Sequence, residues 1–240
     1  LSLLAIPASA DELTDAQAYV RKQNDTITAL LKQPVSKARD TQITGVLEGY
    51  IDHDEMVARA FGAKCPTGQP EASCDRQRYP GIWEKLTEAQ KTEARDLLKR
   101  LIEKNYKKNL IKTLDFDISY KGAREGKVGE SRVTTQAKKK NDPYADTYTV
   151  VYHVQPAGAG TFRIIDIVTE NSSLTKNYYD QFFRLHGKGG FALIADKLKD
   201  RLGQTVIIEN KPGASGSIGA AAVTASKPDG YTFLVSDSAV

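Results

Sequence analysis

The sequence predicts an α+β protein in which helices come first and an antiparallel sheet follows. Two observations support this prediction. Apolar residues recur at helical spacing from Asp11 to Leu114, and from Leu114 to Glu170 they alternate with polar residues at a period of two. Short connections join the strand-like segments, which indicates an antiparallel meander. Helices followed by strands favour an α+β over an α/β architecture.

The helical half divides into four segments with recognisable starts and ends. The first, Asp11–Lys32, ends before Pro34, and the second is Arg39–Ile51. The run Asp52-His53-Asp54-Glu55 could be an acid–base or metal cluster, but acidic residues also cap helices, and we predict a cap for the helix that carries Met56 to Phe61. Thr87-Glu88-Ala89-Gln90 predicts a capping box that opens the longest helix.

Four strands are expected, and a further helix follows them. The third strand places Tyr148, Val150, Tyr152 and Val154 on one face, so one face of the sheet is apolar and packs against the helices. Ser172-Ser173 then offers hydroxyl caps for a helix with Leu174, Tyr178 and Phe182 on one side. The expected strands are Leu114–Tyr120, Lys127–Lys138, Thr147–Gln155 and Thr161–Glu170, with turns at Lys121-Gly122, Asn141-Asp142-Pro143 and Gly158-Ala159-Gly160.

Composition and the first ten residues indicate an exported, soluble protein. The chain has 40% hydrophobic and 27% charged residues, which is ordinary for a globular protein, and its net charge of +4 permits an anionic partner without requiring one. Leu1–Ile6 followed by Ala8-Ser9-Ala10 resembles the end of a secretory signal peptide with a cleavage site before Asp11. We therefore expect residues 1–10 to be a signal-peptide remnant and the mature protein to be periplasmic.

Cys65 and Cys74 enclose the short loop CPTGQPEASC. In an oxidising compartment a disulfide is the expected state, with a contribution of roughly 2–3 kcal/mol. A metal site would need further ligands, and the spacing fits no zinc pattern. No Ser/His/Asp or paired-carboxylate arrangement stands out, and His153 and His186 have no partner at motif spacing. The sequence thus predicts a protein that is not an enzyme, without catalytic residues, metal, cofactor or nucleic-acid partner.

Several short motifs give the chain a family resemblance. They are Ile165-Asp166-Ile167-Val168, Ser173-Leu174, Asn177-Tyr178, Gln181-Phe182 and Lys188-Gly189-Gly190-Phe191, with Trp83, Leu86-Thr87 and Gln90 upstream. With these motifs the chain, over residues 11–202, resembles the MlaC (toluene-tolerance) family of periplasmic phospholipid carriers. Asn171-Ser172 replaces a Gly-apolar pair of that family, and the Cys65–Cys74 loop is an insertion.

The resemblance implies a curved four-stranded antiparallel sheet, nuclear-transport-factor-like, with helices folded over it around an apolar pocket for acyl chains. It also implies the partners: a phospholipid, an inner-membrane ABC transporter complex and an outer-membrane lipoprotein that together maintain outer-membrane lipid asymmetry. The apolar residues themselves could equally fill a core. The candidate lipid-binding residues are Leu97, Leu101, Val150, Tyr152, Val154, Ile165, Ile167, Tyr178 and Phe182.

Residues 203–240 follow a different pattern, a partial βαβ segment. Its motifs, Glu209-Asn210-Lys211-Pro212-Gly213 and Lys227-Pro228-Asp229-Gly230-Tyr231, resemble those of the Bug (tripartite tricarboxylate transporter) solute receptors. This resemblance implies an alternative function, a periplasmic receptor for small carboxylates, with an anion held by Ser215, Gly216 and Ser217 at a helix N-terminus. We expect a carrier domain, residues 11–202, joined to a receptor-like fragment.

Overall fold

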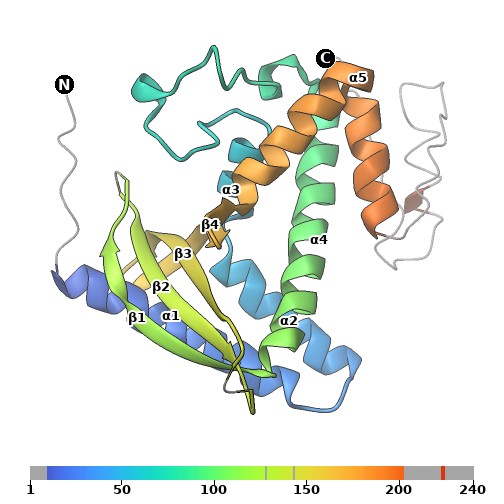
Figure 1. Ribbon diagram of the computed structural model, residues 1–240. Helices are drawn as coiled ribbons and strands as arrows, with labels where there is room; N and C mark the ends of the chain where they lie inside the picture. Colours follow the sequence, from blue (N-terminus) through green and yellow to red (C-terminus); the bar gives the residue numbers. More distant parts are fainter. Residues whose placement is uncertain (1–9, 128, 143, 203–222, 225–240) are drawn as a thin grey trace.

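The computed structural model describes residues 10–127, 129–142, 144–202 and 223–224 (Figure 1). Within them the α+β prediction is confirmed. The predicted signal-peptide remnant up to Ser9 and nearly all of the receptor-like segment lie outside these residues. The helices are α1 Ala10–Leu31, α2 Lys37–Tyr50, α3 His53–Ala60, α4 Glu88–Thr113 and α5 Leu174–Leu202, and the strands are β1 Phe116–Glu125, β2 Ser131–Lys139, β3 Thr147–Gly158, β4 Thr161–Thr169 and β5 Ser172–Ser173.

The predicted helix starts are confirmed by their hydrogen bonds. The Asp52 carboxylate accepts a hydrogen bond of 2.9 Å from the backbone N–H of Glu55, so this acidic residue caps α3. Thr87 and Gln90 form the capping box of α4: each side-chain oxygen accepts a hydrogen bond from the other residue's backbone N–H, at 3.2 and 3.0 Å. The described residues contain no group of three or more His, Cys, Asp or Glu side chains that could hold a metal ion.

The sheet is an antiparallel meander with strand order β1-β2-β3-β4-β5. The four predicted strands are confirmed, and β5 adds a two-residue strand that the sequence did not predict. The predicted turn at Lys121-Gly122 is wrong. Gly122 lies inside β1, where the pairing with β2 shifts by one residue, and its φ of +122° suits a β-bulge that only glycine adopts without strain. The chain reverses instead between Gly126 and Glu130, whose backbones are joined by a 2.8 Å hydrogen bond.

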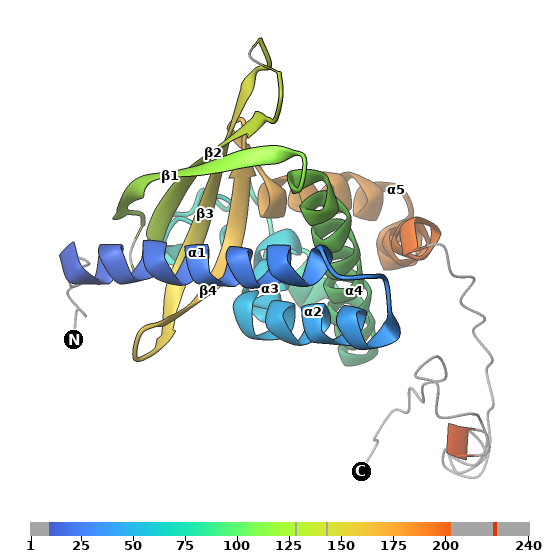
Figure 2. The same cartoon turned by 90° about the horizontal axis from the view of Figure 1, so that it is seen from below.

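One face of the sheet packs against the helices, and we call it the inner face. α1 runs across the strands on this side and contacts β1, β2 and β4 (Figure 2). The junction between α2 and α3 forms a parallel β-bridge with β4, between Ile51 and Ile164. In this bridge the backbone N–H of Asp52 donates to the carbonyl of Ile164 at 2.8 Å. No helix among the described residues is long and apolar enough to cross a membrane.

The helices α3, α4 and α5 form an aromatic core beside the sheet. Phe61 lies at its centre, with ring centroids 4.8 Å from Phe182, 5.9 Å from Trp83 and 6.5 Å from Phe191. α5 breaks at Gly189-Gly190, where Gly190 has a φ of +63°. The break turns the second half of α5 back onto α4 (Figure 1), where it is held by a 2.8 Å ion pair between Lys199 and Glu93.

Candidate functional site

The inner face of the sheet is buried at one end and exposed at the other. Along β3 the inward-facing residues are Val154, Tyr152, Val150 and Tyr148, paired across the ladder with the inward-facing residues of β2. Val154 is fully buried, Tyr152 and Val150 are half-buried, and Tyr148 is 45% exposed. The helices therefore cover only part of an apolar wall.

We call the buried part the closed end and define it by Val133, Val154, Phe162 and Ile164, all buried. Tyr19 of α1 covers Phe162 there, with ring centroids 5.9 Å apart. The open end is one row across three strands: Ile118 of β1, Ala137 of β2 and Tyr148 of β3. Ile118 is 41% exposed, so large apolar side chains face solvent at this end.

The nine predicted lipid-binding residues fall into separate places. Val150, Tyr152 and Ile167 lie together on the half-buried middle of the inner face, where Tyr152 and Ile167 are cross-strand partners. Val154 belongs to the closed end. The remaining residues are buried: Leu97, Leu101, Tyr178 and Phe182 in the helical core, and Ile165 at the bulge of β4, outside that core cluster.

The sequence also pointed to Ser172-Ser173 as the start of α5. Ser173 does cap this helix, because its hydroxyl oxygen accepts a 3.1 Å hydrogen bond from the backbone N–H of Lys176. Asp166 of β4 supports the same turn and accepts from the backbone N–H of Thr175 at 3.0 Å. The strand that carries Ile165 and Ile167 is thereby fixed to the helix that carries Tyr178 and Phe182.

A polar cluster beneath the inner face was missed by the sequence-based prediction. It consists of Asn24 of α1, Tyr50 of α2, Tyr106 of α4, Tyr120 of β1 and Tyr152 of β3; we call it the tyrosine cluster. The Asn24 amide donates to the Tyr120 hydroxyl at 3.2 Å and accepts from the Tyr50 hydroxyl at 3.5 Å. One sequence signal was available: Asn24 interrupts the apolar stripe of α1 between Val20 and Ile27.

The pKa values of the tyrosine hydroxyls in this cluster are raised. Burial raises the pKa of Tyr50 and Tyr106 well above its ordinary value, and neighbouring hydroxyls add to the effect. Burial and the nearby Tyr120 also raise the pKa of Tyr152 to about 12, with the amide of Asn24 acting in the opposite direction. The cluster is therefore neutral at physiological pH and offers hydrogen bonds rather than charge.

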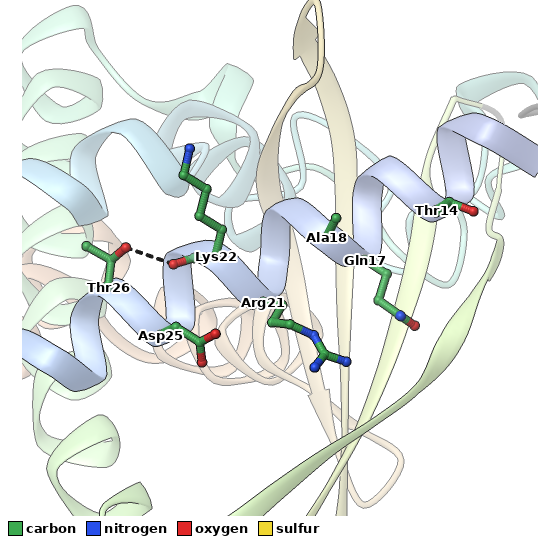
Figure 3. A pocket seen from close by; sticks show the side chains of 7 residues that line it. All are labelled: Thr14, Gln17, Ala18, Arg21, Lys22, Asp25 and Thr26. Atoms are coloured by element: carbon green, nitrogen blue, oxygen red, sulfur yellow. Dashed lines mark hydrogen bonds between the residues drawn. The ribbon is translucent and has the colours of Figure 1, made fainter.

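Two surface hollows are lined mainly by polar or charged residues. The first lies along one side of α1, lined by Thr14, Gln17, Ala18, Arg21, Lys22, Asp25 and Thr26 (Figure 3). The guanidinium of Arg21 lies 4.3 Å from the ring centre of Tyr120. The second hollow is lined mainly by charged residues such as Asp52, Lys64 and Arg163. None of the nine predicted lipid-binding residues lines either hollow, so the enclosed apolar pocket stays a prediction.

The predicted disulfide between Cys65 and Cys74 is confirmed. Its loop is tied to the turn between β1 and β2, because the Lys127 ammonium donates to the Thr67 carbonyl. His153, for which the sequence showed no partner, lies 3.4 Å from the Glu130 carboxylate. The predicted anion-binding residues Ser215, Gly216 and Ser217 lie outside the described residues.

Helices that leave part of an apolar sheet face uncovered are a feature of proteins that bind apolar ligands. Comparison with known proteins identifies the family. The model of the MlaC protein family matches residues 81–200, half of the chain, and the chain belongs to this family. The fold agrees with that of a phospholipid-binding protein from Ralstonia solanacearum, solved in complex with a phospholipid, at a TM-score of 0.59 and 20% identity over 79% of this chain and 98% of that one.

The second predicted resemblance is confirmed as well. The model of the tripartite tricarboxylate transporter family receptor matches residues 191–240. A UPF0065 protein of Bordetella bronchiseptica is 52% identical over 42 residues, which are 18% of this chain and 12% of that protein. The BugT protein of Bordetella pertussis is 48% identical over 46 residues, 19% of this chain and 14% of that protein. The chain thus spans only a small part of the curated relatives it matches.

The receptor match begins directly after the break in α5. Phe191, Ile194 and Leu198 follow Gly190 and are buried in the same core as Phe61. Residues 191–202 therefore resemble the receptor family in sequence and pack as part of the α+β body in the structure.

Proposed function

We propose that this protein is a phospholipid carrier that holds acyl chains against the inner face of its sheet. The observation that carries the proposal is the run of Val150, Tyr152 and Ile167, apolar or aromatic side chains that the helices leave half-buried. Membership of the MlaC family and the phospholipid in the Ralstonia neighbour support it. Each CH₂ moved from a bilayer to an apolar wall keeps about 0.8 kcal/mol of burial free energy, so a carrier can exchange lipid with membranes at little net cost.

In this proposal the protein works in the periplasm and is not an enzyme. It passes phospholipid between an inner-membrane ABC transporter complex and an outer-membrane lipoprotein, and so maintains outer-membrane lipid asymmetry. The disulfide between Cys65 and Cys74 fits an oxidising compartment. Because the lipid is not altered chemically, the direction of transport comes from the partners that load and unload the carrier.

The proposal is tested by measuring the phospholipid that co-purifies with the protein. The full chain is purified without detergent and extracted with organic solvent, and phospholipid is quantified by mass spectrometry. We expect phospholipid with wild type and at least a tenfold loss with Val150→Glu, because a carboxylate on the wall would have to be desolvated against acyl chains.

Val35→Glu is the matched control, because Val35 is 81% exposed between α1 and α2, and this variant should keep its lipid. Absence of phospholipid from the gently purified wild type, together with no uptake from vesicles, would contradict the proposal.

The receptor match over residues 191–240 favours one alternative, a receptor for small carboxylates with Ser215, Gly216 and Ser217 at its anion site. Isothermal calorimetry with a series of dicarboxylates separates the two functions. A carrier of phospholipid should give no binding heat, whereas saturable heat with one dicarboxylate would favour the receptor.

A further inference from the structure

The tyrosine cluster brings hydroxyl groups from four different elements to one place inside the protein. Tyr50, Tyr106, Tyr120 and Tyr152 belong to α2, α4, β1 and β3, and Asn24 of α1 lies among them. Tyr50 and Tyr106 are buried in the same core, and Tyr120 and Tyr152 pack against it. In keeping with this, neighbouring phenols add to the raised pKa of Tyr50 and Tyr106. An apolar core needs no such convergence, because phenylalanine would fill the same volume without a polar atom to satisfy.

One hydroxyl of the cluster has no partner. The Tyr106 hydroxyl oxygen is buried and makes no hydrogen bond within the described structure, and the residue is only 9% exposed. A buried donor left unpaired costs about 1–3 kcal/mol. The amide of Asn24 bonds to Tyr50 and Tyr120 and makes no hydrogen bond with the Tyr106 hydroxyl.

Tyr152 of the cluster lies where the apolar wall changes from covered to uncovered. Tyr152 is the cross-strand partner of Val133 at the closed end. Along β3, Val150 lies two residues from Tyr152, and the exposed Tyr148 lies two residues beyond Val150. In a diacyl lipid the ester carbonyls occupy the corresponding border, between a hydrated headgroup and apolar chains. A carbonyl oxygen accepts hydrogen bonds and carries no charge, which suits neutral phenol donors.

We propose that the tyrosine cluster binds the carbonyl oxygen of an acyl ester, with the Tyr106 hydroxyl as donor. The inference rests on the proposed lipid-carrier function and names the part of the lipid that the protein recognises. It makes the carrier selective for ester-linked lipids over ether-linked lipids of the same headgroup and chain length.

The experiment measures this selectivity by competition. Full-length protein is loaded with a pyrene-labelled phosphatidylethanolamine, which is displaced by dioleoyl phosphatidylethanolamine or by its di-O-oleyl ether analogue. The ether lipid lacks both carbonyls. We expect wild type to bind the diester roughly threefold to tenfold more tightly, as the loss of one net hydrogen bond requires.

Tyr106→Phe should weaken the binding of the diester lipid alone, so that the protein binds the two lipids with similar affinity. The Tm of this variant should stay at or above that of wild type, because the substitution removes an unpaired polar atom. The matched control is Tyr179→Phe. Its hydroxyl donates to the Pro80 carbonyl at 2.9 Å outside the cluster, so this variant should lose stability and keep the selectivity.

Equal binding of the two lipids by wild type would overturn the inference and leave the carrier function standing. The inference would also be overturned if Tyr106→Phe kept the selectivity, because the hydroxyl would then not bind the ester. It would be overturned as well if this variant failed to fold, because the hydroxyl would then bond to a partner within the protein. Binding of neither lipid would overturn the carrier function and this inference together.

Discussion

The two ends of the inner face are built from the same kind of sequence and have different surroundings. At the closed end Val154 and Ile164 are fully buried, whereas at the open end Ile118 and Tyr148 are 41% and 45% exposed. Both ends alternate apolar and polar residues at a period of two. The difference comes from the helices, which cover one end and stop short of the other.

The closed end is also held from the opposite side of the sheet. The turn between β1 and β2 carries Lys127, which donates to the Thr67 carbonyl in the disulfide loop, and Glu130, which lies beside His153 of β3. Val154 is the next residue along β3. This end is therefore held by both the helices and the disulfide loop, which suits it as the stable base of the wall that we propose to bind lipid, whose other end stays accessible.

The largest expected effect on stability comes from comparing an isoleucine-to-alanine substitution at each end of the inner face. Ile164→Ala should lower the free energy of unfolding by about 2–5 kcal/mol, because it leaves a cavity in a packed core. Ile118→Ala should lower it by less than about 1 kcal/mol, since the side chain is already partly in water. Urea denaturation monitored by circular dichroism measures both. Equal losses would show that the open end is packed as tightly as the closed end.

The sequence predicted the elements well because their signals are local. The capping residues Asp52 and Thr87 and the alternation along β3 depend on neighbours a few residues away, and the structure confirms them. The turn at Lys121-Gly122 was wrong because glycine serves a bulge as well as a turn, and only the pairing with β2 decides between them.

The site was harder to predict because it depends on contacts between distant segments. Periodicity placed Val150 on the apolar face but did not show how far the helices reach over it. Tyr120 meets Asn24, and Tyr106 comes near Tyr120, only after α1, α4 and β1 are packed together. The tyrosine cluster therefore had no motif in the sequence beyond a polar residue in an apolar stripe.

The second-largest expected effect on stability comes from the disulfide loop between Cys65 and Cys74. The double variant Cys65→Ala/Cys74→Ala should lower the free energy of unfolding by roughly 2–3 kcal/mol, as expected for a short closed loop. Hydrogen exchange should show faster opening of residues 126–127 and 129–131, since Lys127 loses its ordered partner.

The amides of residues 147–150 at the open end serve as the internal control and should keep their exchange rates. Uniform acceleration across the sheet would mean that the disulfide supports the whole fold rather than its closed end.

The smallest expected effect is the contribution of Glu130 to the free energy of unfolding, and this contribution depends on pH. Burial alone would raise the pKa of this carboxyl, but hydrogen bonds from His153 and the Lys127 backbone N–H, together with nearby positive charges, outweigh burial and lower the pKa to about 2. A carboxylate whose pKa is lower in the folded than in the unfolded protein stabilises the fold above the unfolded value of about 4.5, and this stabilisation is lost as the pH falls towards 2.

Glu130→Gln should therefore lower the free energy of unfolding at pH 7 by on the order of 2 kcal/mol, and the difference from wild type should shrink steadily between pH 4.5 and pH 2. Glu125→Gln controls for the loss of one negative charge, because Glu125 is exposed on the same hairpin, and it should change stability by less than about 0.5 kcal/mol. A Glu130→Gln difference that stays constant down to pH 2 would mean that the side chain acts through its shape and not its charge. The closed end would then be held by packing and the disulfide, without an ionic contribution from its outer side.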